Sequence, residues 1–276
     1  MFNSSNPPKT LFLIDGSGFI FRAYHALPPL SRPDGTPVGA VMGFCNMLVK
    51  LLAEHGDDHI AVIFDASRKN FRNDIYADYK AHSQPPPEDL IPQFPLMREA
   101  ASAFGLPIAE MEGFEADDLI ATYARLAVEA GQEVMIVSSD KDLMQLVRNG
   151  VKLMDPMKGI QIDEKGVFEK FGVTPDKVID VQALAGDSSD NVPGVAGIGI
   201  KTAAELITTY GSLENLLAHT AQIKQPKRRE SLERDAELAR ISKQLVTLCD
   251  TAPVPLPLNA LVHNPDNKYA LKLFLE

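Results

Sequence analysis

The sequence has few cysteines and no long apolar run, and each absence excludes a class of protein. Its 276 residues include two cysteines, Cys45 and Cys249, too few for a disulfide framework or a cysteine-based metal site. No apolar run approaches the roughly 18 residues of a membrane-spanning helix. The opening MFNSSNPPKT has neither a basic leader nor an apolar signal segment. We therefore expect a cytoplasmic protein with no membrane partner.

The sequence also lacks an excess of positive charge. Its 27 basic residues face 37 acidic ones, a formal net charge of −10, which normally argues against a nucleic-acid partner. Nine of the acids, however, fall in a few short motifs described below. Without those nine, 27 basic residues face 28 acidic ones. The acidity is concentrated, so it is compatible with a DNA partner.

Three short apolar runs each end in an aspartate. They are TLFLID, HIAVIFD and EVMIVSSD, which end at Asp15, Asp65 and Asp140. Their composition is typical of strands buried in a parallel sheet, and amphipathic helical patterns at 39–56 and 115–131 separate them. Because the carboxyl ends of parallel strands lie at one edge of the sheet, we expect the three aspartates to converge there. The alternation predicts an α/β fold.

The pattern changes in the second part of the chain. After about residue 175 the strand signals fade, and short helical patterns follow at 203–217 and 234–248. We therefore expect an α/β domain over 1–175 and a helical region over 176–276.

The three aspartates belong to a larger set of acids in short motifs. The set is Asp15, Asp65, Glu115, Asp117, Asp118, Asp140, Asp142, Asp187 and Asp190. Taken singly, these are acids that helix N-termini and turns favour. Taken together at one sheet edge, they indicate a shared positive counter-ion.

The chemistry of this set favours a particular kind of ion. Carboxylate oxygens without histidine or cysteine suit Mg²⁺ or Mn²⁺ rather than zinc, and nine acids exceed the needs of one ion, so we expect two or more ions. Paired ions of this kind clamp the oxygens of a phosphodiester during hydrolysis. Without metal, mutual repulsion should oppose folding, so we expect Asp118→Asn or Asp187→Asn to raise the melting temperature in EDTA.

A basic and aromatic segment follows Asp65. It reads ASRKNFRNDIYADYKAHSQPPPEDL, and its cations and two of its rings are Arg68, Lys69, Arg72, Lys80, Tyr76 and Tyr79. Such alternation suits a single-stranded nucleic acid, whose phosphates bind cations and whose bases stack on rings. An exposed helix of the same composition is the alternative. Arg22 is either another phosphate clamp or a helix-surface arginine.

A glycine-rich stretch, GDSSDNVPGVAGIGIKTAAELI, occupies 186–207. A nucleoside-triphosphate loop needs G-x-x-x-x-G-K-[ST] after a strand, but Ile200 interrupts that spacing and no strand pattern precedes it, which excludes a nucleotide-hydrolysing switch. The alternative is a helical hairpin whose turn aims backbone N–H groups at a phosphate of duplex DNA. The residues of this predicted DNA contact are Gly194, Gly197, Gly199, Lys201 and Thr202.

Five blocks of the sequence resemble, in order, the signature motifs of the 5′-nuclease domain of bacterial DNA polymerase I, in the flap endonuclease superfamily. They are LIDGSGFIFRAYHALPPL, FDASRKNFRNDIYADYKA, EGFEADDLIATYA, SSDKDLMQL and GDSSDNVPGVAGIGIKTAAELI. The resemblance implies a PIN-like α/β core over 1–175 with a mainly parallel sheet flanked by helices. It also implies a helical arch over about 68–92 and a helix-three-turn-helix (helix-hairpin-helix) element in a C-terminal DNA-binding region.

The resemblance also implies roles for individual residues. One group of metal ligands matches Asp15, Asp65, Glu115, Asp117 and Asp118, and a second matches Asp140, Asp142, Asp187 and Asp190. The residues that hold the scissile phosphate match Arg22 and Lys80. The arch residue that contacts an unpaired base matches Tyr79, and another arch cation matches Arg72. The segment 194–202 matches a hairpin that holds K⁺ in relatives.

These roles imply a structure-selective, metal-dependent 5′-nuclease that acts on 5′ flaps and nicked duplex DNA in primer removal and repair synthesis. We expect a monomer in the bacterial nucleoid, attached to a polymerase domain in a longer protein. A PIN-type ribonuclease is one alternative, although such domains are generally shorter and need no helical hairpin. A catalytically silent DNA-junction binding module is another, although it would be expected to have lost some of the acids.

Overall fold

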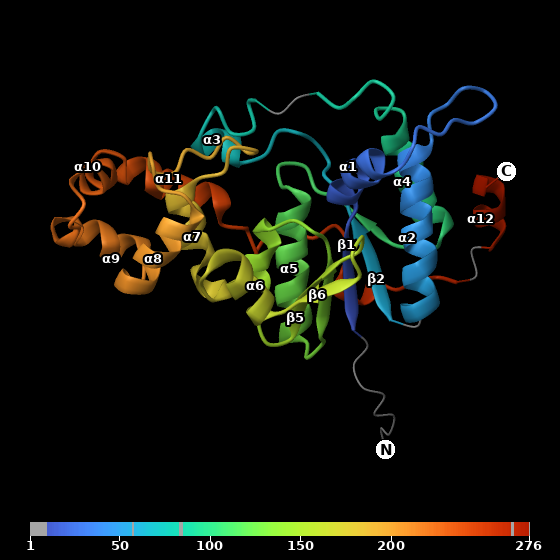
Figure 1. Cartoon of the computed structure of the whole chain (residues 1–276). Helices are drawn as coiled ribbons and strands as arrows, with labels where there is room; N and C mark the ends of the chain where they lie inside the picture. Colours follow the sequence, from blue (N-terminus) through green and yellow to red (C-terminus); the bar gives the residue numbers. More distant parts are fainter. Residues whose placement is uncertain (1–9, 57, 83–84, 266–267, 276) are drawn as a thin grey trace, which may run out of the picture.

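The computed structural model describes residues 10–56, 58–82, 85–265 and 268–275. At its centre lies a sheet with the strand order β3-β2-β1-β4-β5-β6 (Figure 1). The parallel strands are β1 (Leu11–Asp15), β2 (His59–Ile63), β3 (Ile108–Ala109), β4 (Val134–Val137) and β5 (Val151–Asp155), and β6 (Ile160–Ile162) runs antiparallel to β5. The predicted α/β fold with a mainly parallel sheet is confirmed.

The strand order creates a crevice at one edge of the sheet. From β1 the chain moves outward to β2 and β3, and it then returns to place β4 on the other side of β1. Such a reversal is a topological switch point, where the loops after the two central strands diverge and leave room for a ligand. The three strands predicted from the sequence, β1, β2 and β4, are the ones that surround this point.

Helices cover both faces of the sheet because the central strand is apolar on both sides. Phe12 and Ile14 of β1 pack in one buried cluster with α1 (Gly16–Ala26), α2 (Gly39–His55) and α4 (Gln93–Ala103). Leu11 and Leu13 point the other way and pack with α5 (Ala116–Glu129). This two-sided burial is the reason that the strands read as continuous apolar runs.

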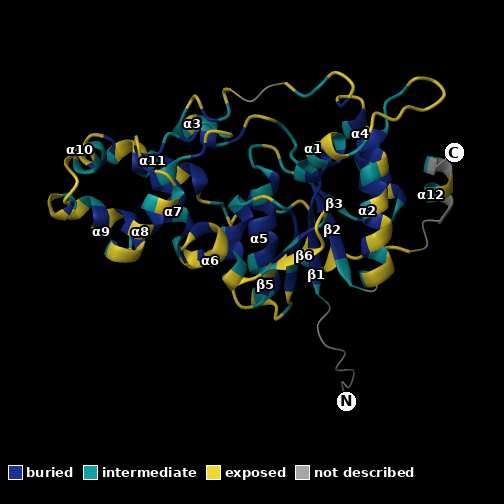
Figure 2. Cartoon of the chain, in the orientation of Figure 1, coloured by how far each residue is buried: buried dark blue, intermediate teal, exposed yellow. Residues whose placement is uncertain are grey.

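The second part of the chain is helical. After α6 (Glu164–Phe171), which precedes residue 175, come α7 (Val178–Ala185), α8 (Ile200–Tyr210), α9 (Leu213–Ala218), α10 (Pro226–Arg234) and α11 (Ala236–Val246). The pattern predicted as one helix over 203–217 is two, because Gly211 has a φ of 81° and the Ser212 side chain caps α9. Val181 and Leu206 share a buried cluster with Leu119 of α5, so one core continues into both parts (Figure 2). The division at residue 175 stays a prediction.

The proline-rich segment that follows α11, TAPVPLPLNALV (251–262), packs back against the α/β part. The N–H of Ala252 donates to Thr122 Oγ1 at 3.0 Å, and the Tyr123 hydroxyl donates to the carbonyl of Leu256 at 2.9 Å, which fixes the tail along α5. His263 contacts the carbonyl oxygens of Gly56 and Phe104, and α12 (Lys268–Leu275) then packs on α4.

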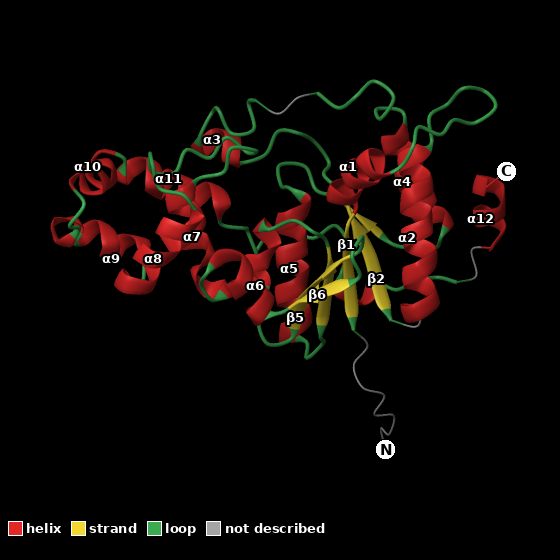
Figure 3. Ribbon diagram, viewed as in Figure 1, coloured by secondary structure: helices red, strands yellow, loops and turns green. Residues whose placement is uncertain are grey.

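Residues 66–92 are here called the strap, and they include the predicted helical arch over about 68–92. Within 68–82 and 85–92 the structure has one helix, α3 (Arg72–Ile75), and the rest is turns and irregular chain (Figure 3). The prediction of a helical arch is therefore wrong for these residues. Consecutive prolines lack the N–H groups that a helix needs, and buried side chains of the strap anchor it to the body.

In the described part of the chain, no helix is long and apolar enough to cross a membrane.

Candidate active site

Asp15 lies in the crevice between β1 and β4 and is 4% exposed. Its Oδ1 accepts a hydrogen bond from the Gly18 N–H at 2.7 Å, and its Oδ2 accepts one from Ser138 Oγ at 2.8 Å. The same Ser138 oxygen accepts the N–H of Asp140 at 3.0 Å. Burial, together with repulsion from Asp140 and Asp65, raises the pKa of Asp15 to about 6. The switch point therefore brings the ends of β1 and β4 together, as expected.

Asp65 and Asp117 join this group from β2 and α5. Asp65 Oδ1 accepts the N–H of Ala116, in the first turn of α5, at 2.8 Å. Burial raises the pKa of Asp117 well above its usual value, and repulsion from Asp140, Asp15, Glu115 and Asp65 raises it further. The acids that repel Asp117 belong to both predicted groups, because Asp140 is a member of the second.

Asp187 and Asp190 lie on a tight loop that requires glycine at both ends. Gly186 and Gly194 have φ values of 71° and 63°. A Cβ on Gly194 would lie 2.4 Å from the Gly186 nitrogen, so the two backbones touch. This closure brings both aspartates to a cavity of about 20 Å³, lined in part by Glu115, Asp117, Asp142, Asp187 and Asp190. The two predicted groups of acids therefore meet at one cavity.

Two lysines bridge acids that come from different elements. Lys80 Nζ forms an ion pair with Glu115 and lies 3.5 Å from Asp190 Oδ2. Lys141 Nζ pairs with Asp187 and lies 3.4 Å from Asp142 Oδ1. Burial opposes the charge of Lys80, but Glu115, Tyr79 and Asp190 together outweigh it and raise the pKa of Lys80. Positive charge is thus stabilised at two places in the site.

The arrangement of side chains matters for metal binding. Within the described ranges, no three His, Cys, Asp or Glu side chains lie close enough to hold one ion as they stand. Oxygen-only donors around a cavity of about 20 Å³ nonetheless suit Mg²⁺ or Mn²⁺ chemically. The ammonium groups of Lys80 and Lys141 show where these acids stabilise positive charge. The donor set therefore fits such ions once the two lysine side chains move away.

Asp118 and Arg72 do not have their predicted roles. Arg72 NH1 and NH2 donate to both carboxylate oxygens of Asp118, at 2.8 and 2.7 Å, and the side chains are 1% and 0% exposed. The N–H groups of Glu115 and Cys249 occupy the remaining acceptor positions of Asp118. The prediction of Asp118 as a metal ligand is wrong for this arrangement, because its oxygens are all engaged. Arg72 is likewise a buried structural cation rather than a DNA contact of an arch.

Tyr79 also differs from its predicted role. Its side chain is buried, at 5% exposed, and its hydroxyl lies 3.0 Å from Glu115 Oε2 and 3.2 Å from Asp190 Oδ2. A ring enclosed in this way cannot stack on a base, so the predicted base contact is wrong for this arrangement. Tyr79 instead links the strap to acids of both groups.

The remaining predicted cations lie at the rim. Arg22 NH1 lies 3.5 Å from Asp155 Oδ1, and both line a groove of about 950 Å³ that Asp15 and Asp140 also line. Arg68 and Lys69 are exposed at the start of the strap. A phosphate role for these side chains stays a prediction.

The glycine-rich turn is partly as expected. Gly197, Gly199 and Lys201 are exposed where α8 begins, and the first N–H groups of any helix lack intrahelical partners. Gly194 is different: it is buried, and its N–H donates to Ser242 Oγ at 2.9 Å. The prediction of Gly194 as a phosphate contact is therefore wrong, because its donor is used internally. Thr202 is half-buried beside Lys201.

Sequence reasoning missed several residues of the site. Ser138 follows β4 and bonds to Asp15, Lys141 lies between two of the predicted acids, and Asp155 ends β5 as Asp15 ends β1. An apolar run that ends in an aspartate is the signal that identified Asp15. The same signal would have identified Asp155 if the strand over 151–155 had been recognised in the sequence. Gln182 donates to Asp142 from α7, and no local pattern marks it.

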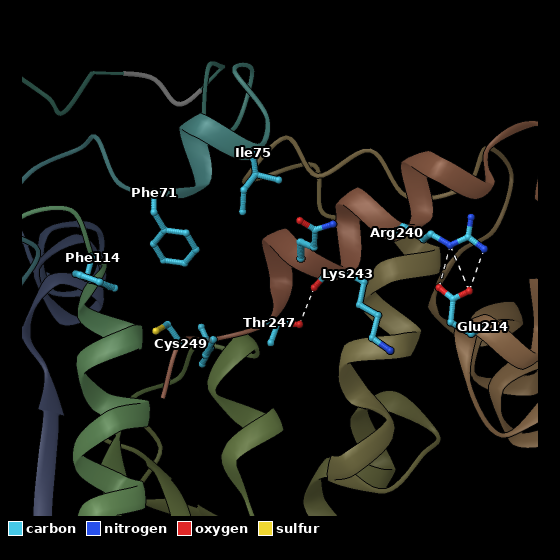
Figure 4. Close-up of a pocket in the computed structure, with 10 residues that line it drawn as sticks. Phe71, Ile75, Phe114, Glu214, Arg240, Lys243, Thr247 and Cys249 are labelled. Atoms are coloured by element: carbon cyan, nitrogen blue, oxygen red, sulfur yellow. Dashed lines mark hydrogen bonds and ion pairs between the residues drawn. The ribbon is translucent and has the colours of Figure 1, made fainter. Parts of the chain in front are cut away.

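A separate pocket of about 670 Å³ lies near this site (Figure 4). Phe71, Ile75 and Phe114 line one side, and Cys249 lies at its floor. At the opposite end, Arg240 is paired with Glu214 at 2.9 Å. Phe71 and Phe114 directly precede Arg72 and Glu115, so this pocket and the acidic cavity share two chain segments.

Comparison with known families agrees with the geometry. Residues 10–172 match the 5′-3′ exonuclease N-terminal resolvase-like domain, and residues 173–268 match the 5′-3′ exonuclease C-terminal SAM fold. The chain therefore belongs to the 5′-3′ exonuclease family, and the predicted family is confirmed.

Individual relatives give the same result. The chain is 57% identical to DNA polymerase I of Rhizobium leguminosarum over 96% of its own length but 27% of that protein's. It is 41% identical to the 5′-3′ exonuclease of Aquifex aeolicus, covering 96% of this chain and 91% of that protein. The chain thus spans less than a third of the length of the Rhizobium relative.

Solved structures show the same fold. T5 5′-exonuclease with bound divalent zinc ions has a TM-score of 0.75 and 21% identity, covering 97% of this chain and 98% of that one. The bacteriophage T5 D15 flap endonuclease complex with DNA and metal ions has a TM-score of 0.72 and 20% identity, covering 97% and 100%. At such identities the likeness concerns the fold.

Proposed function

We propose that this chain is a structure-selective, divalent-metal-dependent 5′-nuclease that hydrolyses phosphodiester bonds at 5′ flaps and 5′ ends of DNA. The observation that carries the proposal is that acids of both predicted groups line one cavity, while Asp15 and Asp140 line a second groove. The acids of the cavity are Glu115, Asp117, Asp142, Asp187 and Asp190. The 41% identity to a 5′-3′ exonuclease over nearly the whole of both chains supports it.

The acids would hold two or more Mg²⁺ or Mn²⁺ ions. The residues that would hold them are Asp15, Asp65, Glu115, Asp117, Asp140, Asp142, Asp187 and Asp190. When bound, such ions would supply positive charge to the scissile phosphate and activate water for attack.

The chain's own cations have a complementary task. Lys80 and Lys141 neutralise the acids of the metal-free site, and once displaced they would lie beside the incoming phosphate. Arg22, at the rim of the groove, would hold the phosphate before it reaches the acids. Binding would therefore exchange lysine–carboxylate pairs for lysine–phosphate pairs.

The start of α8 would bind the duplex. Its exposed N–H groups and Lys201 suit a backbone phosphate, and such contacts fix position without reading sequence. K⁺ at the segment 194–202 belongs to the same helix-hairpin-helix proposal. We further propose that the chain acts as a monomeric unit in the bacterial nucleoid, within a longer polymerase.

Cleavage of a labelled 5′-flap duplex tests the proposal. We expect Mg²⁺-dependent release of the flap, abolition by EDTA, and loss of cleavage with retained flap binding in Asp140→Asn. Lys50→Ala, on the exposed face of α2, serves as a matched surface control. Flap binding without cleavage in wild-type protein would favour a silent junction-binding module, and preferential cleavage of single-stranded RNA would favour a PIN-type ribonuclease.

A further inference from the structure

Gln182 is a buried amide that reaches an acid of the site from the helical region. It lies on α7, is 2% exposed, and donates from Nε2 to Asp142 Oδ1 at 2.5 Å. Its Oε1 is also buried and has no hydrogen-bond partner among the residues that the structure describes. Burying an unpaired acceptor is unfavourable, so apolar packing alone is a poor explanation for a glutamine at this position.

A second glutamine holds the same acid by its main chain. Gln145 Nε2 donates to the carbonyl oxygens of Asp142 and Val246, and its Oε1 accepts the N–H of Leu248. Gln145 thus ties the 3₁₀ turn η1 (Asp142–Leu146) to the end of α11. The backbone of Asp142 is fixed by one amide and its carboxylate by the other.

The contact also links two acids of the second group to one helix. Asp187 follows α7 by two residues, and Gln182 reaches Asp142 from the same helix. Gln182 and Lys141 both contact Oδ1 of Asp142, while Asp142 lines the cavity shared with Asp187 and Asp190. A displacement of α7 would therefore move Asp187 and the hydrogen bond that orients Asp142 together.

We propose that Gln182 is a positioning residue that orients Asp142 for divalent-metal binding and makes that orientation depend on α7. The inference rests on the proposed metal-dependent function. Partners that orient metal ligands through hydrogen bonds typically account for 10- to 100-fold in metal affinity or activity.

Mn²⁺ titration of the DNA-free chain, followed by electron paramagnetic resonance, tests the inference without relying on activity. Gln182→Met keeps the side-chain length and removes the donor, so we expect a Kd for Mn²⁺ raised by about 10-fold or more. In cleavage assays the same variant should need more Mg²⁺ for half-maximal turnover and recover most of the wild-type rate at saturating Mg²⁺. A purely structural role would not separate these two quantities.

Val181→Ala is the matched control, because Val181 is fully buried on the same helix. It should lower the melting temperature and leave the Kd for Mn²⁺ unchanged. Equal Kd values for Gln182→Met and wild type, or equal increases in both variants, would overturn the inference. Should Gln182→Met fail to fold, Gln182→Asn tests the same contact with an amide too short to reach Asp142. If wild-type protein neither binds Mn²⁺ nor cleaves DNA, the proposed function itself fails, and the inference with it.

Discussion

Arg72 and Asp118 form a two-pronged ion pair inside the protein, with N–O distances of 2.8 and 2.7 Å. The strap contributes the arginine and the first turn of α5 the aspartate, so the pair fastens the strap at the acidic cavity, which Arg72 also lines. Arg72 also donates to the carbonyl oxygens of Leu245 and Thr247, which brings the end of α11 into the same junction. An acid that seemed to belong to the metal site thus holds three chain segments together.

Neutralising Asp118 should therefore destabilise the protein. Breaking a buried pair costs about 3–5 kcal/mol. The remaining pair of Arg72 NH1 with Glu115 Oε2, at 3.2 Å, offsets part of that cost. We expect Asp118→Asn to lower the melting temperature equally in EDTA and in excess Mn²⁺. This is the reverse of the sequence-based expectation that removing this charge relieves repulsion.

Asp117→Asn is the informative comparison for Asp118→Asn. Asp117 is buried and repelled by four acids, so its neutralisation should raise the melting temperature in EDTA and reduce the gain from Mn²⁺. The expectation for Asp187→Asn also reverses. Lys141 and the N–H groups of Ser189 and Asp190 together outweigh burial and lower the pKa of Asp187. Similar melting behaviour of the Asp117 and Asp118 variants would contradict the distinction drawn here.

The metal-free protein should lose stability as the pH rises through the acidic range. Burial raises the pKa of Asp15 and of Asp142 to about 6, above their usual value of 3.8. The folded protein therefore binds more protons than the unfolded chain between about pH 4 and pH 6, and the stability these groups contribute is lost across that window.

Thermal melts in EDTA at about pH 4, 5 and 6 check this pH dependence. We expect the melting temperature to fall over that range in wild type and to fall less in Asp15→Asn. Excess Mn²⁺ should abolish the fall, because metal binding requires the ionised carboxylates. Parallel curves in EDTA and Mn²⁺ would show that these acids do not share a counter-ion.

Lys80 and Lys201 should affect different steps. Lys80 lies among the acids, so Lys80→Ala should lower the single-turnover rate by on the order of 100-fold, as the loss of a charge-stabilising donor does. Lys201 is exposed at the start of α8, so Lys201→Ala should weaken duplex binding and reduce the slope of log K against log salt by about 1. Loss of affinity alone in both variants would remove Lys80 from the chemistry.

The Tyr79→Phe variant distinguishes two possible roles of Tyr79, as a buried hydroxyl that bonds to acids or as a ring that stacks on a base. The hydroxyl contacts Glu115 and Asp190, and a hydrogen bond to a charged group contributes about 1.5–3 kcal/mol, so the variant should melt lower and cleave more slowly. If the ring instead stacked on a base, Tyr79→Phe would melt and bind like wild type, and Tyr79→Ala would lose flap affinity. Melting curves and flap Kd values for both variants decide between the two roles.

The sequence by itself determined the sheet edge and most of its acids. Strands buried on both faces must be apolar, so the aspartates after β1, β2 and β4 stood out, and parallel pairing forces strand ends to one edge. The spacing around 186–207 likewise ruled out a nucleotide loop, because that loop tolerates no insertion. These are rules of local period and spacing, which a linear sequence displays directly.

Only the tertiary structure decided which charges face the cavity and which face one another. Nothing in FEADDL distinguishes Asp117 from Asp118, yet one turns to four acids and the other to Arg72, 46 residues away in the chain. In the same way Tyr79 and Gln182 acquired their partners from distant segments. Whether a carboxylate binds metal or supports the fold depends on which distant residue hydrogen-bonds to its oxygens. Tertiary packing determines which residue that is.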